Sequence, residues 1–309
     1  MSRQRSPGKH GRTFGVKPIC ELLAFPRSSV YEYLKRQQEQ IGALKRGKLP
    51  IVPAQELLQA IKHDLDTSSF VGEGHRKVWA RLRKKMVVGR NRVLKIMREN
   101  NLLSPSRVRT RPPSVHTACI ATDAPNLMWG TDGSKFYTIE QGWCWIFAVI
   151  DHFNSEVLGW HVSKYGDRFE ALEPLRQAVK VEYGRYEANI ATSLKLRMDN
   201  GSVYTSGTFE DELEFLGIEA SFTMPYSPES NGIAERYFRT LKEQVIWGSV
   251  FQNLQEAQEA ISRFTELYNE EWLLQRLSYQ SPREAKRRYN FHRTANVNST
   301  DLVSNQLVA

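Results

Sequence analysis

Two carboxylates in the second half of the sequence stand at positions suited to chemistry. Residues 194–198 alternate apolar and basic side chains, which is the pattern of a half-buried β-strand. The Asp-Asn-Gly run at 199–201 then ends that strand, and it leaves Asp199 at the carboxyl end, where open α/β sheets place their sites. Glu235 follows after 35 intervening residues, 200–234, which is room for a helix, a strand, a loop and the start of a second helix.

The second of these helices is expected to carry Glu235 and two cations on one face. Glu235, Arg239 and Lys242 are spaced i, i+4 and i+7, so their side chains share one side of a helix. A solvated helix face is the simpler explanation of Glu235 alone, and an Asp-Asn-Gly run is more often a turn than a site. The two carboxylates therefore indicate a site only if a third lies on a neighbouring strand. The apolar residues that form the expected buried stripe of this helix are Ile233, Phe238, Leu241 and Val245.

Asp132 supplies that third carboxylate. It lies in the first of three expected strands, residues 127–139, 143–150 and 157–162, whose short connections predict an antiparallel meander. An acid in the middle of such a strand is out of place in a core unless it is paired or bound to a metal. Three converging carboxylates would repel each other, and a hard, oxygen-seeking cation such as Mg²⁺ would relieve that repulsion.

These residues resemble the DDE triad of the retroviral-integrase superfamily, with 35 residues between Asp199 and Glu235. Five blocks resemble bacterial insertion-sequence transposases of the OrfB type in order and spacing, over residues 54–289. The resemblance implies an α/β, RNase H-like catalytic core with a mixed sheet of five strands flanked by helices, preceded by small all-α helix-turn-helix-like DNA-binding domains. The blocks are WGTDGSKF, WIFAVIDHFNSEVLGWHVS, RMDNGSVYTS, MPYSPESNGIAERYFRTLK and YNEEWLLQRLSYQSPREAKRRY.

The resemblance also implies a reaction. Such a DNA transposase binds the ends of an insertion sequence, cleaves a strand and joins the freed 3′ end to new DNA, by metal-dependent phosphoryl transfer. Two Mg²⁺ ions are expected per site, with Mn²⁺ able to substitute; Asp132 would bridge both ions, and Asp199 and Glu235 would each hold one. Arg239 and Lys242 match the positions of basic residues that hold terminal DNA in retroviral integrases, although ordinary surface cations would look the same.

Charge is divided unevenly along the 309 residues, whose formal net charge is +9. Residues 1–118 hold 25 Lys and Arg against 8 Asp and Glu, whereas the remainder holds 18 against 26. The basic part is typical of a nucleic-acid-binding region, and the acidic part is compatible with metal-dependent catalysis. Ribosomal or membrane-surface contact would give the same basic composition.

Cysteine usage and hydropathy narrow the class of protein further. The sequence has 3 cysteines without paired spacing, so a disulfide framework or a zinc site is not expected, and the zinc module of retroviral integrases has no counterpart here. The longest apolar run, residues 143–150, is too short to span a membrane, and the polar start is not a signal peptide. We expect a cytoplasmic, nucleoid-associated bacterial protein.

The basic part divides into an arm and a small helical domain. Residues 1–53 form a basic arm with a possible helix-turn-helix, for which a plain helical hairpin is an equally good interpretation. Residues 54–102 are expected to form a three-helix, helix-turn-helix-like DNA-binding domain, against the alternative of a solvated basic face. The cations expected to contact DNA from this domain are Arg81, Arg83, Lys84, Lys85, Arg90, Arg92 and Lys95.

The rest of the chain is expected to hold a linker, the catalytic core and a tail. Residues 103–122 form a basic, proline-rich linker, residues 123–290 form the core with its carboxy-terminal helices, and residues 291–309 form a disordered tail. Expected partners are DNA at the element ends and in the target, further copies of the chain on that DNA, and an upstream-frame OrfA protein.

Two other functions are weighed against transposition. A DNA-binding module that has lost catalysis would share the basic part, but it would have no reason to keep all three acids. A nuclease of the same fold that cuts RNA in hybrids fits less well, because the basic amino-terminal part and the SPREA block resemble transposases.

Overall fold

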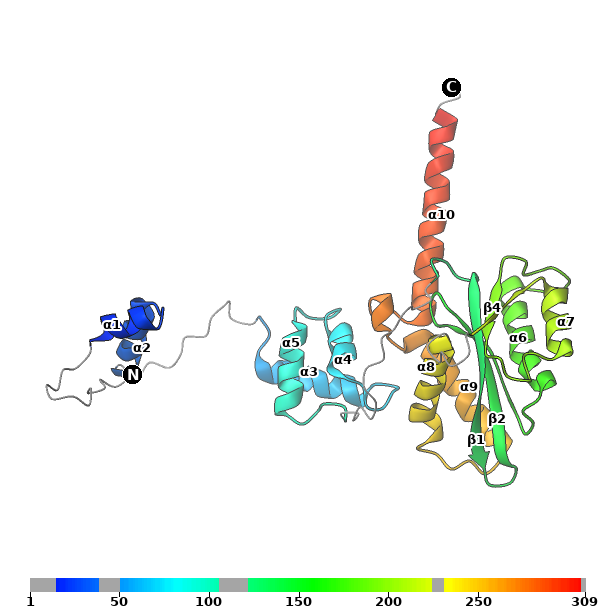
Figure 1. The fold of residues 1–309 in the computed structure, drawn as a ribbon, viewed down its shortest axis with the longest axis horizontal. Coiled ribbons are helices and arrows are strands. Elements are labelled where there is room, and N and C mark those ends of the chain that lie inside the picture. The colour runs from blue at the N-terminus through cyan, green and yellow to red at the C-terminus, as the bar shows by residue number, and fades with distance from the viewer. Residues whose placement is uncertain (1–14, 39–50, 106–121, 224–230, 307–309) are drawn as a thin grey trace. The chain divides into compact units, whose positions relative to one another are not determined.

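The computed structural model describes residues 15–38, 51–105, 122–223 and 231–306 (Figure 1). The chain forms two compact units, Met1–Pro53 and Ala54–Ala309. Within the two described helices of the first unit, Cys20 and Val30 are the buried apolar side chains, which makes this a small pairing of two helices. Those helices are α1 (Val16–Leu22) and α2 (Arg27–Gln38).

The second unit begins with a three-helix domain close to the expected one. Its centre is apolar: Leu57, Ile61, Val78, Val93 and Met97 are fully buried. Each helix contributes one apolar stripe to this core, as amphipathic helices do. The helices are α3 (Ala54–Asp66), α4 (His75–Leu82) and α5 (Arg90–Glu99). Most of the expected linker, residues 106–121, lies outside the described residues.

A five-stranded mixed sheet forms the centre of the remaining chain, in the order β3-β2-β1-β4-β5. The antiparallel meander is confirmed, since β1 pairs with β2 and β2 with β3 in antiparallel register. β4 and β5 then add in parallel beyond β1. The mixed α/β, RNase H-like fold is therefore confirmed. The strands are β1 (Met128–Thr138), β2 (Gly142–Asp151), β3 (Val157–Ser163), β4 (Lys195–Met198) and β5 (Glu219–Phe222).

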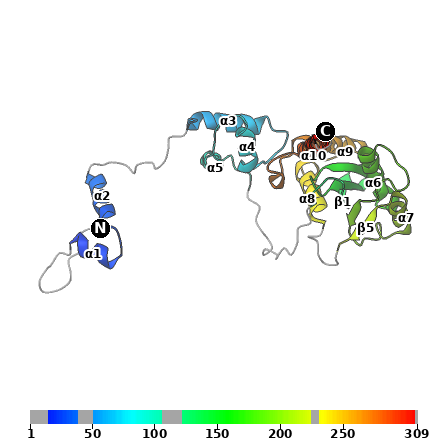
Figure 2. The same cartoon turned by 90° about the horizontal axis from the view of Figure 1, so that it is seen from above.

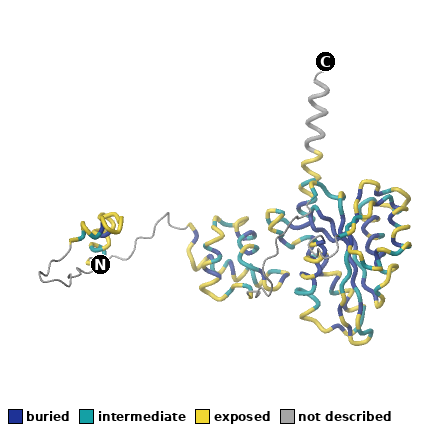
Figure 3. Tube along the Cα trace, in the orientation of Figure 1, coloured by how far each residue is buried: buried dark blue, intermediate teal, exposed yellow. Residues whose placement is uncertain are grey.

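Helices cover both faces of this sheet, so β1 and β2 are buried on two sides (Figures 1 and 2). Side chains alternate between the faces: Trp129 and Phe147 belong to one core cluster, whereas Phe136 and Ile146 belong to the other. The dark blue strands of Figure 3 mark this double core. The covering helices are α6 (Arg168–Tyr183) and α7 (Gly207–Leu216) on the first face, and α8 (Gly232–Leu241), a π-helical turn (Lys242–Ile246) and α9 (Leu254–Glu271) on the second.

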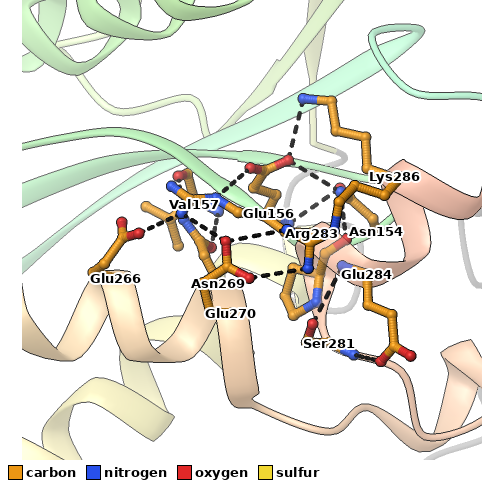
Figure 4. Close-up of polar contacts among 12 residues, drawn as sticks. Asn154, Glu156, Val157, Glu266, Asn269, Glu270, Ser281, Arg283, Glu284 and Lys286 are labelled. Carbon is orange, nitrogen blue, oxygen red and sulfur yellow. Dashed lines mark hydrogen bonds and ion pairs between the residues drawn. The ribbon is translucent and has the colours of Figure 1, made fainter. Parts of the chain in front are cut away.

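The β3 edge of the sheet is closed by side chains from two helices. Asn269 of α9 accepts a hydrogen bond from the backbone N–H of Val157 at 2.9 Å and donates one to its carbonyl oxygen at 2.9 Å (Figure 4). Gln177 of α6 accepts a hydrogen bond from the N–H of Trp160 at 3.2 Å. Three backbone groups that would face outward near the start of β3 are therefore satisfied inside the chain.

The tail differs from expectation, because a long helix, α10 (Pro282–Gln306), replaces the disorder expected from residue 291. No glycine or proline occurs between residues 283 and 306, so nothing in the backbone breaks the helix. Its first turns are anchored beside the β2–β3 connection, where Arg283 and Lys286 each lie 3.1 Å from the buried Glu156 (Figure 4). A 3₁₀ turn, Gln275–Leu277, precedes it.

Two of the cysteines, Cys20 and Cys144, are buried free thiols. Among the described residues, no helix is long and apolar enough to cross a membrane.

Candidate active site

Asp132 projects from the middle of β1, which is held on both sides by β2 and β4. One of its carboxylate oxygens, Oδ1, accepts a hydrogen bond from the Gly133 N–H at 2.7 Å. Burial raises the pKa of Asp132 to about 6 although that hydrogen bond lowers it, and the charges of Asp199 and Glu235 raise it further while Lys242 lowers it. Four ionisable groups from separate elements therefore lie within electrostatic reach of one another.

Asp199 follows the last residue of β4, and β4 runs parallel beside β1, as the Gly130–Arg197 register shows. Its Oδ1 accepts a hydrogen bond from the Gly201 N–H at 2.8 Å, which is the turn expected of Asp-Asn-Gly. A Cβ at Gly201 would lie 2.8 Å from that oxygen, so the turn needs glycine. Asn200 donates to the Thr223 carbonyl at 2.8 Å and ties the turn to the end of β5.

Glu235 lies in the first turn of α8 and is exposed to solvent. Burial of its carboxyl still raises the pKa of Glu235. The helix has the expected orientation, because Phe238 and Leu241 are buried while Arg239 is exposed. Within the described parts of the chain, no three His, Cys, Asp or Glu side chains come close enough together to hold one metal ion.

The donor chemistry of the three carboxylates nevertheless fits a hard divalent cation. Oδ1 of Asp132 and Oδ1 of Asp199 are each held by a backbone N–H, which leaves Oδ2 of each carboxylate as the candidate metal ligand. The mutual repulsion that raises the pKa of Asp132 is the kind of strain that a bound cation removes.

Asn231, the residue before α8, was not predicted as a site residue and proves to fix the helix against β1. Its side chain is buried, and Nδ2 donates to the Thr131 carbonyl at 2.8 Å. A Cβ at Gly130 would lie 2.8 Å from Asn231 Oδ1, so this close approach requires glycine. A helix-starting Asn-Gly pair was the only sequence signal for this role.

Tyr204 is a second residue that sequence reasoning missed. It lies in the turn region after Asp199 and is 4% exposed. Burial raises the pKa of Tyr204 well above its usual value, and the charges of Asp132 and Asp199 add to the effect. Its hydroxyl is therefore a neutral group behind the carboxylates. In sequence it is indistinguishable from a core aromatic residue.

The cations expected to contact DNA are found in different situations. On α8, Arg239 pairs with Glu243 at 3.0 Å, and Lys242 is close enough to lower the pKa of Asp132. In the three-helix domain, Arg81 is bound to both oxygens of Asp64 at 2.8 to 3.1 Å, and also contacts Glu73. In this structure Arg81 therefore serves as an ion-pair partner inside the domain.

The remaining six cations of that domain lie on its surface or near it. The Arg83 guanidinium lies 4.6 Å from the Trp79 ring centroid, and Lys84 is 3.8 Å from Glu284. Lys95 pairs loosely with Glu99 at 3.6 Å. Of these six, Arg92 is partly buried, and the exposed residues are Arg83, Lys84, Lys85, Arg90 and Lys95.

Three family models match the chain. Residues 122–228 and residues 216–282 match two models described as integrase core domains, and residues 54–110 match an HTH-like domain. The chain is 29% identical over 287 residues to the Escherichia coli transposase InsD for insertion element IS2A/D/F/H/I/K, covering 88% of this chain and 91% of that protein. Transposase InsD for insertion element IS2-9 from the K12 strain has the same identity, with 89% of its length covered.

The comparison with solved structures lists chains of retroviral proteins. A chain in the cryo-EM structure of the simian T-cell lymphotropic virus intasome in complex with PP2A regulatory subunit B56 gamma is 19% identical, with a TM-score of 0.45 and 74% of each chain covered. The HTLV-2 integrase catalytic core domain in complex with magnesium is 16% identical, with a TM-score of 0.38, covering 53% of this chain and 97% of that one.

Proposed function

We infer the reaction of this chain from its family, since it belongs to the insertion-sequence transposases of the retroviral-integrase superfamily. It is a DDE-type enzyme that acts on DNA and transfers strands. We propose that Asp132, Asp199 and Glu235 are the catalytic carboxylates. The observation that supports this assignment is that the turn after β4 and the start of α8 bring Asp199 and Glu235 within electrostatic reach of the buried Asp132 carboxyl.

The three carboxylates would hold two divalent cations, which we propose to be Mg²⁺ with Mn²⁺ able to replace it. When bound, the pair of ions would lower the pKa of an attacking hydroxyl and stabilise the charge on the departing 3′ oxygen. By the family resemblance, Asp132 would help to hold both ions. Asp199 and Glu235 would each hold one ion.

The protein's own contribution is to position these groups before DNA arrives. Pairing with Ala148 of β2 fixes the backbone of Asp132, and the turn at Gly201 fixes Asp199. Prearranged ligands are needed because an error of about 1 Å in position can cost roughly a hundredfold in rate. Lys242, about two helical turns after Glu235, would bind the phosphate next to the carboxylates. Arg239, one turn after Glu235, would exchange Glu243 for a neighbouring phosphate.

The reaction proceeds in two displacements at phosphorus. In the first, a water oxygen bonds to a phosphorus atom at the element end while the bond to the 3′ oxygen breaks, and that oxygen takes up a proton. In the second, the freed 3′ hydroxyl loses its proton, bonds to a target phosphorus atom and displaces another 3′ oxygen. No bond to the protein forms, so Tyr204 is not a nucleophile in this scheme.

We propose DNA at the element ends and in the target as the substrate, and several copies of the chain assembled on it. An upstream-frame OrfA protein, and a cytoplasmic, nucleoid-associated location, belong to the same proposal. Of the cations in the three-helix domain, the proposed phosphate contacts are the exposed Arg83, Lys84, Lys85, Arg90 and Lys95, together with the partly buried Arg92. Arg81 would have to leave its ion pair with Asp64 to reach a phosphate.

The test is a strand-transfer assay with a labelled duplex of the element end and a plasmid target, with Mg²⁺ present. The wild type is expected to cleave and to join the 3′ end, whereas Asp132→Asn, Asp199→Asn and Glu235→Gln should bind the duplex without cutting it. Asp211→Asn, an exposed acid on α7, is the matched control and should keep full activity. DNA binding without joining would indicate a binding module, and cleavage confined to RNA in hybrids would indicate a nuclease.

A further inference from the structure

The segment that joins α3 to α4, residues 67–74, reaches from the HTH-like domain onto the catalytic core, and we call it the strap. Phe70, in its middle, is 6% exposed and belongs to the core cluster formed by α8 and α9. Its ring lies 4.8 Å from that of Trp272 and 6.4 Å from that of Phe264, edge to face in both pairs. A side chain of the strap is therefore part of the interior of the core.

Gln244 holds the next residue of the strap by both ends of its amide. Gln244 Oε1 accepts a hydrogen bond from the Val71 N–H at 3.0 Å, and Nε2 donates to the Val71 carbonyl at 2.9 Å. This side chain pairs with the strap as a neighbouring β-strand would. Gln244 lies in the π-helical turn Lys242–Ile246 that directly follows α8, and such turns are frequent at functional sites.

The strap is also fixed from its own domain. The side chain of Glu73 is buried, and it accepts a hydrogen bond from Ser68 at 2.7 Å and contacts Lys77 at 3.2 Å. The Lys77 ammonium in turn lies 2.8 Å from the centroid of the Trp272 ring, so one cation contacts both the strap and the core. Gly72, with φ of +68°, makes the bend between the two attachments.

A second contact between α4 and the core reinforces the first. The rings of Trp79 and Tyr279 are 5.6 Å apart, and Arg83 donates to the Ser278 carbonyl at 3.3 Å. Ser278 and Tyr279 have φ of 57° and 65°, so two successive residues other than glycine occupy the left-handed region. Such strain persists only where the surrounding structure enforces it.

We propose that the strap sets which phosphodiester of the bound DNA reaches the catalytic carboxylates, with Gln244 as the positioning residue. This rests on the proposed function. Lys242, which follows Glu235 and Arg239 on the same side of the chain, begins the π-helical turn, and Gln244, two residues later, is hydrogen-bonded to both backbone groups of Val71. DNA held by the HTH-like domain is thereby kept at a fixed offset from the end of the catalytic helix, and a looser strap would let that offset vary.

The test maps the cleavage position on an end-labelled duplex of the element end with the full chain. Gln244→Leu keeps the size of the side chain and removes both hydrogen bonds, so the ratio of cuts at the wild-type position to cuts at neighbouring positions should fall about tenfold. Gln244→Glu keeps the hydrogen-bond acceptor and loses the donor, so the ratio of cuts should fall by less than in Gln244→Leu. DNA affinity should be unchanged for both variants. Gln255→Leu, on the exposed side of α9, is the matched control and should cut like the wild type.

An insertion of two glycines after Gly72 tests the same idea without touching the core. It lengthens the strap, and the cuts should spread or shift while DNA binding persists. An unchanged cleavage position in Gln244→Leu and in the insertion variant would overturn the proposal, and so would a loss of total cutting without any change in position. If Gln244→Leu does not fold, Gln244→Glu and the insertion decide by the same map. A wild type that cuts no DNA refutes the proposed function instead.

Discussion

The exchange of Asp132 for asparagine should stabilise the metal-free protein while it removes activity. Burial, with added repulsion from Asp199 and Glu235, raises the pKa of Asp132 from 3.8 to about 6. A carboxyl whose pKa is raised on folding does not affect stability at pH values below its pKa in the unfolded chain. It lowers the free energy of unfolding as the pH rises from that pKa to the higher pKa of the folded state. A shift of about two units corresponds to about 3 kcal/mol at neutral pH, as an upper figure for a group that water still reaches.

Asparagine keeps the shape and the Oδ1 acceptor for the Gly133 N–H but carries no charge. In buffer with EDTA, the free energy of unfolding of Asp132→Asn should equal that of the wild type below about pH 4. It should exceed the wild-type value increasingly between pH 4 and 6, and by about 1 to 3 kcal/mol above pH 7. For a unit of this size each kcal/mol raises Tm by about 2 to 4 °C.

Mg²⁺ should reverse this order. The cation is expected to raise the Tm of the wild type at pH 8 and to leave Asp132→Asn nearly unchanged, because ligands that bind only the folded state stabilise it by mass action. The measurements are urea and thermal melts at several pH values, with Asp211→Asn as the control. Equal stability of wild type and variant in EDTA at pH 8 would refute the electrostatic argument, and joining activity in the variant would refute the assignment of Asp132.

Three further outcomes are expected. Arg239→Glu should fold normally, since an exposed substitution alters stability by only about ±0.5 kcal/mol, but it should lose most strand-transfer activity. Phe238→Glu should unfold the core in thermal melts, because it places a charge on the buried side of α8. The opposite pattern would mean that α8 is rotated about its axis. Asn231→Ala removes a buried hydrogen-bond donor to the Thr131 carbonyl, so it should lower the free energy of unfolding by about 1 to 3 kcal/mol and slow cleavage. Equal urea midpoints for the variant and the wild type would show that Asn231 does not fix α8 against β1. A fragment of residues 1–118 should bind duplex DNA with a slope of about −0.9 in log K against log salt for each phosphate contacted. Equally tight and equally salt-sensitive binding by the core alone would show that the main DNA-binding surface lies in the core.

Periodicity and turn chemistry predicted much of the fold. The alternation before Asp199 and the short connections after Asp132 led to the right strands, because these signals depend on neighbouring residues. The buried stripe of α8 was predicted for the same reason, and Phe238 is 4% exposed. The catalytic role of the three carboxylates stays a prediction, although their elements lie where the spacing placed them.

The features that escaped prediction depend on contacts between distant residues. Val71 and Gln244 are 173 positions apart, and neither type predicts a clamp. Arg81 resembled its exposed neighbours until the fold brought Asp64, 17 positions away, to its Nε and Nη2 atoms. The helix α10 was missed for a different reason, since polar composition was taken to mean disorder although no residue there breaks a helix.

The closed β3 edge limits how copies of this chain can associate. Asn269 occupies both backbone groups of Val157 that an added strand would use, and α6 lies so close that a Cβ at Gly159 would fall 2.1 Å from the Pro174 carbonyl oxygen. The opposite edge, β5, is only 4 residues long. Continuous sheets across two copies are therefore disfavoured at the start of β3, which protects the chain against fibrous self-association.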